Sequence, residues 1–268
     1  MRHLIIPGII SIFLFACSNP SRQNKGRTSS SDSGSSTAAA GSPGNTQPAR
    51  NNAAQGGTDT VWASLFDGKT LNGWHSYGSD APGGAWEVES STIHLKHGEK
   101  DGYQTKGGGD LVSNDTFENF DLLITWKVAA KSNSGILFDV QDDKKQYPET
   151  WNTGPEIQVL DITGNEDAHS PKHQAGDLYD LVACKSHTAM PPGFWNETEI
   201  ICNNGNLDII INRVNVLTTT LWNDNWKKLI AGSKFKTMPG FGVFKSGHFA
   251  LQDHGGEVWY KDIKVKRL

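Results

Sequence analysis

Apolar side chains occupy every second position of residues 120–128, from Phe120 to Val128, with Asp121, Thr125 and Lys127 between them. Successive side chains of a β-strand point to opposite faces, so this alternation predicts a strand that is buried on one face. Similar short patterns predict further strands at residues 86–89, 92–95, 136–140, 177–183, 195–202, 207–216, 247–252 and 258–265. Many short strands with almost no helical periodicity predict an all-β, two-sheet jelly-roll sandwich.

Turn signals separate these predicted strands. We expect turns at four places: Ser90-Ser91, Asn133-Ser134-Gly135, Asn203-Asn204-Gly205 and Gly255-Gly256. One stretch departs from the strand pattern, because residues 225–235 carry apolar side chains at helical spacing. With Asp224 as its N-cap, this stretch predicts one short helix on a long loop.

Residues 1–17 have the form of a bacterial secretory signal. Arg2 and His3 precede an apolar run from Leu4 to Ala16 that is too short to span a bilayer as a helix. Cys17 follows directly, as in the lipobox of bacterial lipoproteins, so we expect cleavage before Cys17 and acylation of this residue. An ordinary signal peptide cut nearby is the alternative, and it would also export the protein.

Residues 18–60 contain no Val, Ile, Leu, Met, Phe, Trp or Tyr. Such a segment cannot bury a core, so it predicts a disordered tether between a lipid anchor and a domain at residues 61–268. We therefore expect the protein in the bacterial cell envelope, on the periplasmic side or at the outer-membrane surface. Its contact with the membrane would come through the N-terminal lipid alone.

Charge and composition limit the classes of molecule that this protein can bind. Without residues 1–17 the net charge is −5, which argues against nucleic acid as a partner. The nine Trp of residues 61–268 favour a carbohydrate ligand, because sugars stack on exposed indole rings, although some Trp must belong to the core. Cys184 and Cys202 could form a disulfide in an exported protein or remain as two buried thiols.

The segment Gly154–Asp161 reads as a strand with two different faces. Ile157 and Val159 would face the core, and Glu156 and Gln158 would face outward. A one-residue bulge at Val159-Leu160 would bring Asp161 to the face of Glu156. Most enzymes that cleave glycosidic bonds use two carboxyl groups on the two sides of that bond. The alternative is an ordinary strand whose carboxylates are solvated.

Polar residues also gather at three other places that could carry chemistry: His169 and His173 in one loop, Lys234 and Lys236 after the predicted helix, and Gln252-Asp253-His254 at a glycine turn. A histidine could act as a general acid or base, and an adjacent Asp253 would raise the pKa of His254. Loop histidines, solvated lysines and an Asx turn are the alternatives. Asp139, Asp142 and Asp143 could hold calcium, although they lack EF-hand spacing.

Five segments together resemble the 3-keto-disaccharide hydrolase domain family, which is common among exported proteins of Bacteroidetes. They are Leu65–Trp74 (LFDGKTLNGW), Gly154–Asp161 (GPEIQVLD), Lys172-His173 with Ala175-Gly176, Leu178–Asp180 (LYD) and Leu251–Gly255 (LQDHG). The resemblance runs in order from Leu65 to Leu268. It implies a concanavalin/laminarinase-like jelly roll that acts on glycosides oxidised at C3, by hydrolysis or by elimination.

The chemistry of a 3-keto sugar suggests roles for these residues. The ketone acidifies the hydrogen on C2, so a base could remove it, the group on C1 could leave, and water could add back. We expect His173 or Glu156 as the base, and His254 with Asp253 as the proton donor or enolate partner. A divalent cation such as calcium could stabilise the enolate. The expected substrate-binding residues are Trp151, Gln158, Asp161, Tyr179, Lys234 and Gln252.

Two rival functions stay open at the level of sequence. Glu156-x-Gln158-x-x-Asp161 is similar to the Glu-x-Asp-x-x-Glu strand of retaining β-glucanases, but Gln158 disfavours their double displacement. A carbohydrate-binding lipoprotein without catalysis is the other rival. Within the family resemblance, Asp177, Cys184 and Phe194 depart from the residues expected in relatives, and we expect them to affect specificity at the rim of the site.

Overall fold

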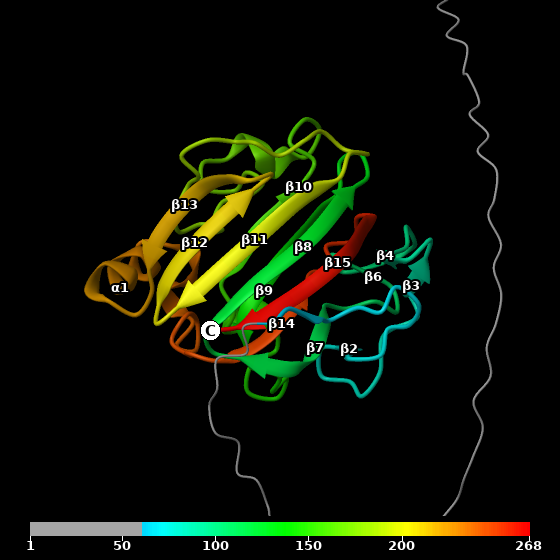
Figure 1. The fold of residues 1–268 in the computed structure, drawn as a ribbon, viewed down its shortest axis with the longest axis horizontal. Helices are drawn as coiled ribbons and strands as arrows, with labels where there is room; N and C mark the ends of the chain where they lie inside the picture. Colours follow the sequence, from blue (N-terminus) through cyan, green and yellow to red (C-terminus); the bar gives the residue numbers. More distant parts are fainter. Residues whose placement is uncertain (1–60) are drawn as a thin grey trace, which may run out of the picture. The chain divides into compact units, whose positions relative to one another are not determined.

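The computed structural model describes residues 61–268, which form two antiparallel β-sheets packed against each other (Figure 1). The predicted signal, Cys17 and the predicted tether lie outside the described residues. In residues 61–268, no helix is long and apolar enough to cross a bilayer. The all-β, two-sheet architecture predicted from the alternation is confirmed.

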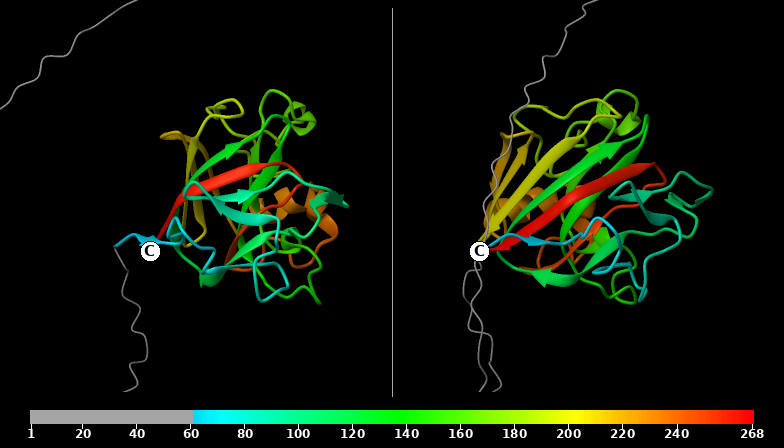
Figure 2. Two further views of the ribbon diagram at one scale, coloured as in Figure 1. Left: turned by 90° about the vertical axis from the view of Figure 1, so that its right-hand side faces the viewer. Right: turned by 45° about the vertical axis from the view of Figure 1, so that its right-hand side comes forward.

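The larger sheet has eight strands. Seven of them lie in the order β13 (Val214–Thr220), β12 (Asn206–Ile211), β11 (Asn196–Asn203), β8 (Phe120–Val128), β15 (Val258–Arg267), β4 (Thr92–Leu95) and β3 (Trp86–Glu89), and β1 (Ala63–Ser64) also pairs with β15. Figure 2 shows this sheet from two further sides.

The smaller sheet has five strands, in the order β10 (Glu156–Leu160), β9 (Asn133–Val140), β14 (Gly247–Leu251), β7 (Leu111–Phe117) and β2 (Trp74–Ser76). A two-stranded sheet pairs β5 (Lys100–Asp101) with β6 (Gln104–Thr105). The helical segments are α1 (Asp224–Ala231) and three 3₁₀ turns, η1 (Thr150–Asn152), η2 (Glu166–His169) and η3 (Lys234–Thr237).

The main core lies between the two sheets. Phe120 on β8 packs against Phe138 on β9 and Phe249 on β14, with ring centroids 6.0 and 4.8 Å apart. Trp126 on β8 is fully buried, and its indole N–H donates to the hydroxyl of Thr198 (2.8 Å). These large rings bury the most apolar area per residue, so they carry much of the stabilisation between the sheets.

The smaller sheet is also buried on its outer face. Every residue of β9 and β10 is buried. A separate apolar cluster lies apart from the main core and contains Tyr77, Val112, Leu137, Val140 and Ala250, with Trp151 packed against it. A bulge in β9, where Asp139 has a φ of 56°, accounts for Leu137 and Val140 sharing this cluster. Loops therefore cover a sheet face that would otherwise meet solvent, and the site lies beneath them.

Two predicted strands differ from the structure. Residues 177–183 form no strand, because Leu178 makes only single bridges to Ile157 and Val182, and the chain turns at Asp180, where φ is 58°. Residues 207–216 are not one strand but parts of β12 and β13. Asn212 and Arg213 between them have φ values of 50° and 70°, which is the backbone of a tight hairpin turn.

Other local predictions differ as well. The segment Asn133–Gly135 belongs to β9, and the turn lies earlier, at Lys131 with a φ of 63°. The helix α1 begins at Asp224 and ends at Ala231, and its N-cap is Asn223, whose side chain accepts from the backbone N of Trp226 (2.8 Å). The strands β1, β2, β5, β6 and β7 have no counterpart among the predictions. The predicted turns at Ser90-Ser91 and at Asn203–Gly205 are confirmed by their left-handed residues.

The two cysteines of this domain are free thiols. Cys202 is buried on β11 and Cys184 is partly buried in a loop. Burial raises the pKa of both thiols. Of the two alternatives, the structure therefore shows the pair of thiols.

Candidate active site

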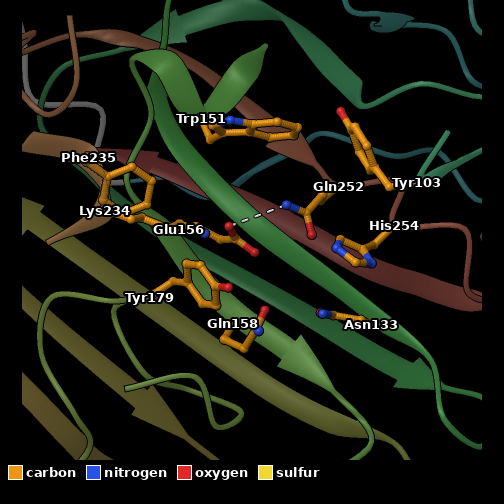
Figure 3. Close-up of a pocket in the computed structure, with 10 residues that line it drawn as sticks. All are labelled: Tyr103, Asn133, Trp151, Glu156, Gln158, Tyr179, Lys234, Phe235, Gln252 and His254. Atoms are coloured by element: carbon orange, nitrogen blue, oxygen red, sulfur yellow. Dashed lines mark hydrogen bonds between the residues drawn. The ribbon is translucent and has the colours of Figure 1, made fainter. Parts of the chain in front are cut away.

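A cavity of about 180 Å³ opens on the outer face of the smaller sheet (Figure 3). We call it the ring cavity; its lining residues are Tyr103, Asn133, Trp151, Glu156, Gln158, Tyr179, Lys234, Phe235, Gln252 and His254. Seven of the ten predicted site residues are among them. Pockets for drug-sized ligands measure roughly 300–1,000 Å³, so the ring cavity suits a smaller ligand, such as one sugar ring.

Glu156 stands at the centre of the ring cavity because of the register of β10. This strand pairs with β9 without a break, from Glu156 opposite Leu137 to Leu160 opposite Asn133. The alternation therefore places Glu156 and Gln158 on the outer face, as predicted. Gly135 on β9 leaves room for the carboxylate, because a Cβ there would lie 2.6 Å from Cδ of Glu156.

Two amide groups hold the carboxylate of Glu156. Nε2 of Gln252 lies 3.4 Å from Oε2 (Figure 3). The amide nitrogen of Gln158 is assigned toward Oε1 of Glu156 (3.2 Å) and the carbonyl of Ser134 (2.9 Å), because the reverse orientation would face its oxygen to acceptors only. Each carboxylate oxygen thus has its own donor, which keeps the group in one position.

Burial controls the charge of Glu156. Its side chain is removed from solvent, and this raises the pKa of Glu156 to about 8, although the ammonium of Lys234 opposes the shift. Partial burial lowers the pKa of Lys234, against the attraction of nearby carboxylates. The ammonium of Lys234 also lies 3.9 Å from the ring centroid of Tyr179. A carboxyl group with a pKa near the working pH is a suitable general base.

His254 lies across the ring cavity from Lys234 (Figure 3). Its ring packs near Tyr103, whose ring also packs against Trp151, with centroid distances of 5.8 and 5.2 Å. Burial lowers the pKa of His254, so the imidazole is neutral at neutral pH. The carboxylate of Asp253 does act to raise this pKa, as expected, but burial outweighs its attraction and the net shift is downward.

Asp253 does not line the ring cavity, contrary to its predicted place in the site. Gln252 and His254 both face the cavity, and Asp253 between them faces a loop. Its carboxylate accepts from the backbone N of Thr105, Gly109 and Gly255 at 2.9–3.0 Å and from the hydroxyl of Thr105 at 3.1 Å. It therefore holds the loop that carries Tyr103 over the cavity, and it is a positioning residue.

Replacing Asp253 with Asn should lower the stability of the domain by about 3 kcal/mol, because the neutral amide leaves buried donors without a partner. For a domain of this size we expect the melting temperature to fall by roughly 6–12 °C in calorimetry. Asp101→Asn in the same region is the matched control, since Asp101 is exposed, and its melting temperature should not change. An unchanged melting temperature for Asp253→Asn would contradict this structural role.

Asp161 is also absent from the ring cavity, and the predicted bulge before it does not exist. The unbroken register of β10 turns Asp161 away from Glu156. Its carboxylate accepts from Lys131 N (2.8 Å), Thr163 N (2.8 Å) and the Thr163 hydroxyl (2.6 Å). Burial would raise the pKa of Asp161, but these hydrogen bonds lower it below its ordinary value. Asp161 therefore fastens two turns and does not pair with Glu156.

His173 lies behind the wall of the ring cavity. Its imidazole packs against Tyr179 with centroids 4.3 Å apart, and its nitrogens lie 3.7 Å from Asp167 and 3.5 Å from Asp180. The structure thus places His173 where it can support Tyr179 but where it does not line the cavity. His169 and Lys236 are exposed and do not line it either.

The three residues that depart from the family resemblance, Asp177, Cys184 and Phe194, do not line the ring cavity. Asp177 is buried, and its carboxylate accepts from the backbone N of Gln174 (2.8 Å) and of Cys184 (2.7 Å). Phe194 is exposed on the surface. Their predicted influence on specificity at the rim has no support in this geometry.

Three lining residues were missed from the sequence. Tyr103 comes from a loop with no strand signal, and the sequence pattern predicts a turn at Asn133, which lies on β9 instead. Phe235 directly follows Lys234 in η3, so the prediction of Lys234 as a site residue is the sequence signal that could have indicated Phe235. Tyr103 owes its position to Asp253 and to Glu149, which accepts from the tyrosine hydroxyl (2.8 Å).

The predicted calcium loop does not form a cluster. Asp142 accepts from His75 (2.8 Å) and Gly78 (3.1 Å), whereas Asp139 is buried at the bulge of β9. In residues 61–268, no group of three or more His, Cys, Asp or Glu side chains is arranged to hold a metal ion. Participation of a divalent cation stays a prediction, which dialysis against a chelator followed by metal addition would test.

Comparisons with known proteins show the family of this chain. Residues 61–266 match the family model described as 3-keto-alpha-glucoside-1,2-lyase-like domain. A 3-keto-disaccharide hydrolase of Bacteroides thetaiotaomicron is 34% identical over 227 residues, which cover 77% of this chain and 78% of that protein.

Solved structures show the same fold. A crystal structure from Parabacteroides distasonis, provisionally classed as a glycosyl hydrolase, is 27% identical with a TM-score of 0.69, covering 77% of this chain and 94% of that one. A second one from the same organism is 21% identical, with a TM-score of 0.60, and covers 78% of this chain and 100% of that one. The family match and the hydrolase relative together show that the chain belongs to the 3-keto-alpha-glucoside-1,2-lyase-like domain family and is an enzyme of the glycoside-cleaving, hydrolase type.

Proposed function

We propose that this enzyme cleaves 3-keto-glycosides by removing the C2 hydrogen with Glu156, expelling the substituent on C1 and adding water. The observation that carries the proposal is the single carboxylate of the ring cavity. A conventional retaining glycosidase needs two carboxyl groups about 5–5.5 Å apart. Among the described residues that line the cavity, Glu156 alone is acidic. A ketone in the substrate makes one base sufficient.

The steps balance without a second carboxylate. Glu156 takes the proton from C2, and the electron pair of that bond forms the enolate of C2 and C3. The enolate then returns to the ketone as the C1–O bond breaks, which leaves a double bond between C1 and C2. The leaving oxygen takes the proton that Glu156 removed from C2, so Glu156 is again a carboxylate. Water adds at C1 and gives its proton to Glu156, which returns it to C2, so the net reaction is hydrolysis.

The other lining residues suit this reaction. Lys234 and the neutral N–H of His254 stand on opposite sides of Glu156, where they can stabilise the enolate oxygen and the leaving oxygen. Trp151 offers a face for stacking against the sugar ring. Tyr179 and the amide of Gln158 can hydrogen-bond its hydroxyls. Asp253 and His173 act only by positioning the cavity wall.

Turnover of matched substrates tests the proposal. The purified protein should release the C1 substituent from 3-keto-glucosides and leave the unoxidised parent glucosides intact, as measured by mass spectrometry. In deuterium oxide, recovered substrate or product should carry deuterium at C2. Cleavage of the unoxidised parents would contradict the proposal and favour a conventional glucanase.

The pH profile provides a second test. Glu156 must be ionised to act as a base, so kcat/KM should rise with pH and level off above about 8, the raised pKa of this group. Lys234→Met should shift the rising part of the pH profile to higher pH, because the ammonium of Lys234 lowers the pKa of Glu156. Lys236→Met, two residues away and exposed, is the control and should leave this part of the profile unchanged. A fall of kcat/KM as the pH rises through 8 would instead indicate that Glu156 acts in its protonated form, as a general acid.

We also propose that acylation of Cys17 attaches the protein to the cell envelope, on the strength of the sequence of residues 1–17. Replacing Cys17 with Ser should move the protein from the membrane fraction to the soluble fraction of cells. Retention in the membrane fraction would contradict the lipid anchor.

A further inference from the structure

A buried carboxyl group, Asp110, lies outside the lining of the ring cavity and takes no part in the steps proposed above. It directly precedes β7, and only 2% of its surface is exposed. Burying a carboxyl group costs free energy unless the group is hydrogen-bonded. The hydrogen-bond partners of Asp110 therefore show which parts of the molecule it holds together.

The carboxylate of Asp110 joins three segments that are distant in the sequence. Its Oδ1 accepts from the backbone N of Asp253 (2.9 Å) and from Nε2 of Gln104 (3.2 Å). Its Oδ2 accepts from the hydroxyl of Thr150, which is fully buried. Each of these partners is the direct neighbour in sequence of at least one residue that lines the ring cavity. The lining residues next to them are Tyr103, Trp151, Gln252 and His254.

The bond to Thr150 fixes one wall of the cavity. Thr150 is the first residue of η1, and its carbonyl accepts from the backbone N of Gly154 (3.0 Å), just before β10. Holding Thr150 therefore places Trp151 relative to the first residue of β10, which is Glu156. In the view of Figure 3, the indole of Trp151 lies above Glu156.

We infer that Asp110 is a positioning residue of this enzyme, which holds Trp151 at a fixed distance from the segment of Gln252 and His254. The inference rests on the proposed function for the ring cavity as the place of turnover. The hydrogen bonds of Asp110 themselves do not depend on which bond is cleaved. A sugar ring stacked on Trp151 meets Glu156 correctly only if these walls keep their spacing, because the cavity has a volume of about 180 Å³.

The charge of Asp110 also acts on Glu156. Burial raises the pKa of Asp110 to about 7, and its negative charge above this pH adds to the effect of burial in raising the pKa of Glu156. Removing the charge should therefore move the rising part of the pH profile to lower pH. The other titratable groups whose charges interact with Asp110 are Tyr77, Tyr103, Glu149, Asp253 and Tyr260.

Two substitutions separate position from charge. Asp110→Asn keeps an oxygen for the backbone N of Asp253 and offers an N–H to the oxygen of Thr150. It should keep kcat/KM within about threefold of the unmodified enzyme at high pH, with the rising part of the profile at lower pH. Asp110→Ala removes all three hydrogen bonds and should lower kcat/KM for a 3-keto-glucoside by about 10²-fold. Equal losses in both variants, or no loss in Asp110→Ala, would overturn the inference.

Thr150→Val tests the link to η1 with little change in side-chain volume. It deletes the hydroxyl that bonds to Asp110 and should lower kcat/KM about fivefold. In the background of Asp110→Ala it should have little further effect, because both changes break the same link. Additive losses would contradict the link.

Asp161 provides the matched control, since it is another buried, hydrogen-bonded carboxylate outside the ring cavity. Asp161→Ala should lower the melting temperature, as Asp110→Ala does, and leave kcat/KM unchanged. Fluorine NMR of the full-length protein labelled with fluorotryptophan gives a measurement without substrate. The resonance of Trp151, assigned through Trp151→Phe, should shift in Asp110→Ala and not in Asp161→Ala. An unmoved resonance in Asp110→Ala would overturn the inference. A shifted resonance in an enzyme that turns over no 3-keto-glycoside would overturn the proposed function and leave the position of Asp110 supported.

Discussion

Replacing Glu156 with Gln should lower kcat/KM for a 3-keto-glycoside by about 10³-fold, within the 10²–10⁴ that a general base typically contributes. The amide keeps the shape of the carboxylate but cannot accept the C2 proton. Because burial raises the pKa of Glu156, ionising it costs folding free energy. The variant should therefore melt at the same or a higher temperature above pH 8. Steady-state kinetics and calorimetry on one preparation measure both effects.

Asp161→Asn is the matched control for Glu156→Gln. The pKa of Asp161 is lowered by its hydrogen bonds, so its ionised form stabilises the fold above its unfolded pKa of about 4 and loses this contribution as the pH falls below it. We expect this variant to lose about 2–3 kcal/mol of stability at neutral pH and to keep its kcat. A selective loss of kcat in Asp161→Asn, with stability intact, would restore the paired-carboxylate hypothesis.

Replacing Gly135 with Ala should lower kcat/KM by about 10²-fold, since a misplacement of roughly 1 Å in a reacting group has that effect. The new Cβ would meet Cδ and Cγ of Glu156 at 2.6 and 2.7 Å, so the carboxylate has to move. Gly135 does not need the left-handed backbone, so alanine is allowed there and the fold should persist. Kinetics and circular dichroism together separate displacement from unfolding.

Two controls define how Gly135 acts. Gly84→Ala places a methyl group in open space on an ordinary backbone and should leave kcat/KM unchanged. In the background of Glu156→Gln, the change Gly135→Ala should have little further effect, because both changes act through one carboxylate. Additive losses would show that Gly135 acts through something other than Glu156.

The strand pattern predicted much of the site because the face on which a side chain lies depends only on its position among consecutive residues of the same strand. Glu156 and Gln158 fall on one face and Ile157 on the other by alternation alone, and the structure confirms both faces. The same alternation separates Asp253 from Gln252 and His254. The prediction that all three side chains converge in a turn was therefore wrong for Asp253, which does not line the ring cavity.

Other residues depend on contacts between distant parts of the chain. Tyr103 reaches the ring cavity because the carboxylate of Asp253, 148 residues after Thr105, accepts from that loop. His173 is kept out of the cavity by Tyr179, against which it packs. Neither arrangement has a local sequence signal, because each is set by which loops pack over the outer face of the smaller sheet.

The sequence by itself determined the two-sheet fold, the faces of β10 and the carboxylate that stands in the cavity, since the period of a strand is a property of the backbone. Only the tertiary structure decided that Glu156 stands without a second carboxylate and has a raised pKa. It also decided that Asp161 and Asp253 hold turns. The reason is burial: the loops that cover the smaller sheet remove Glu156 from water, and no local pattern specifies how distant loops close over one sheet face.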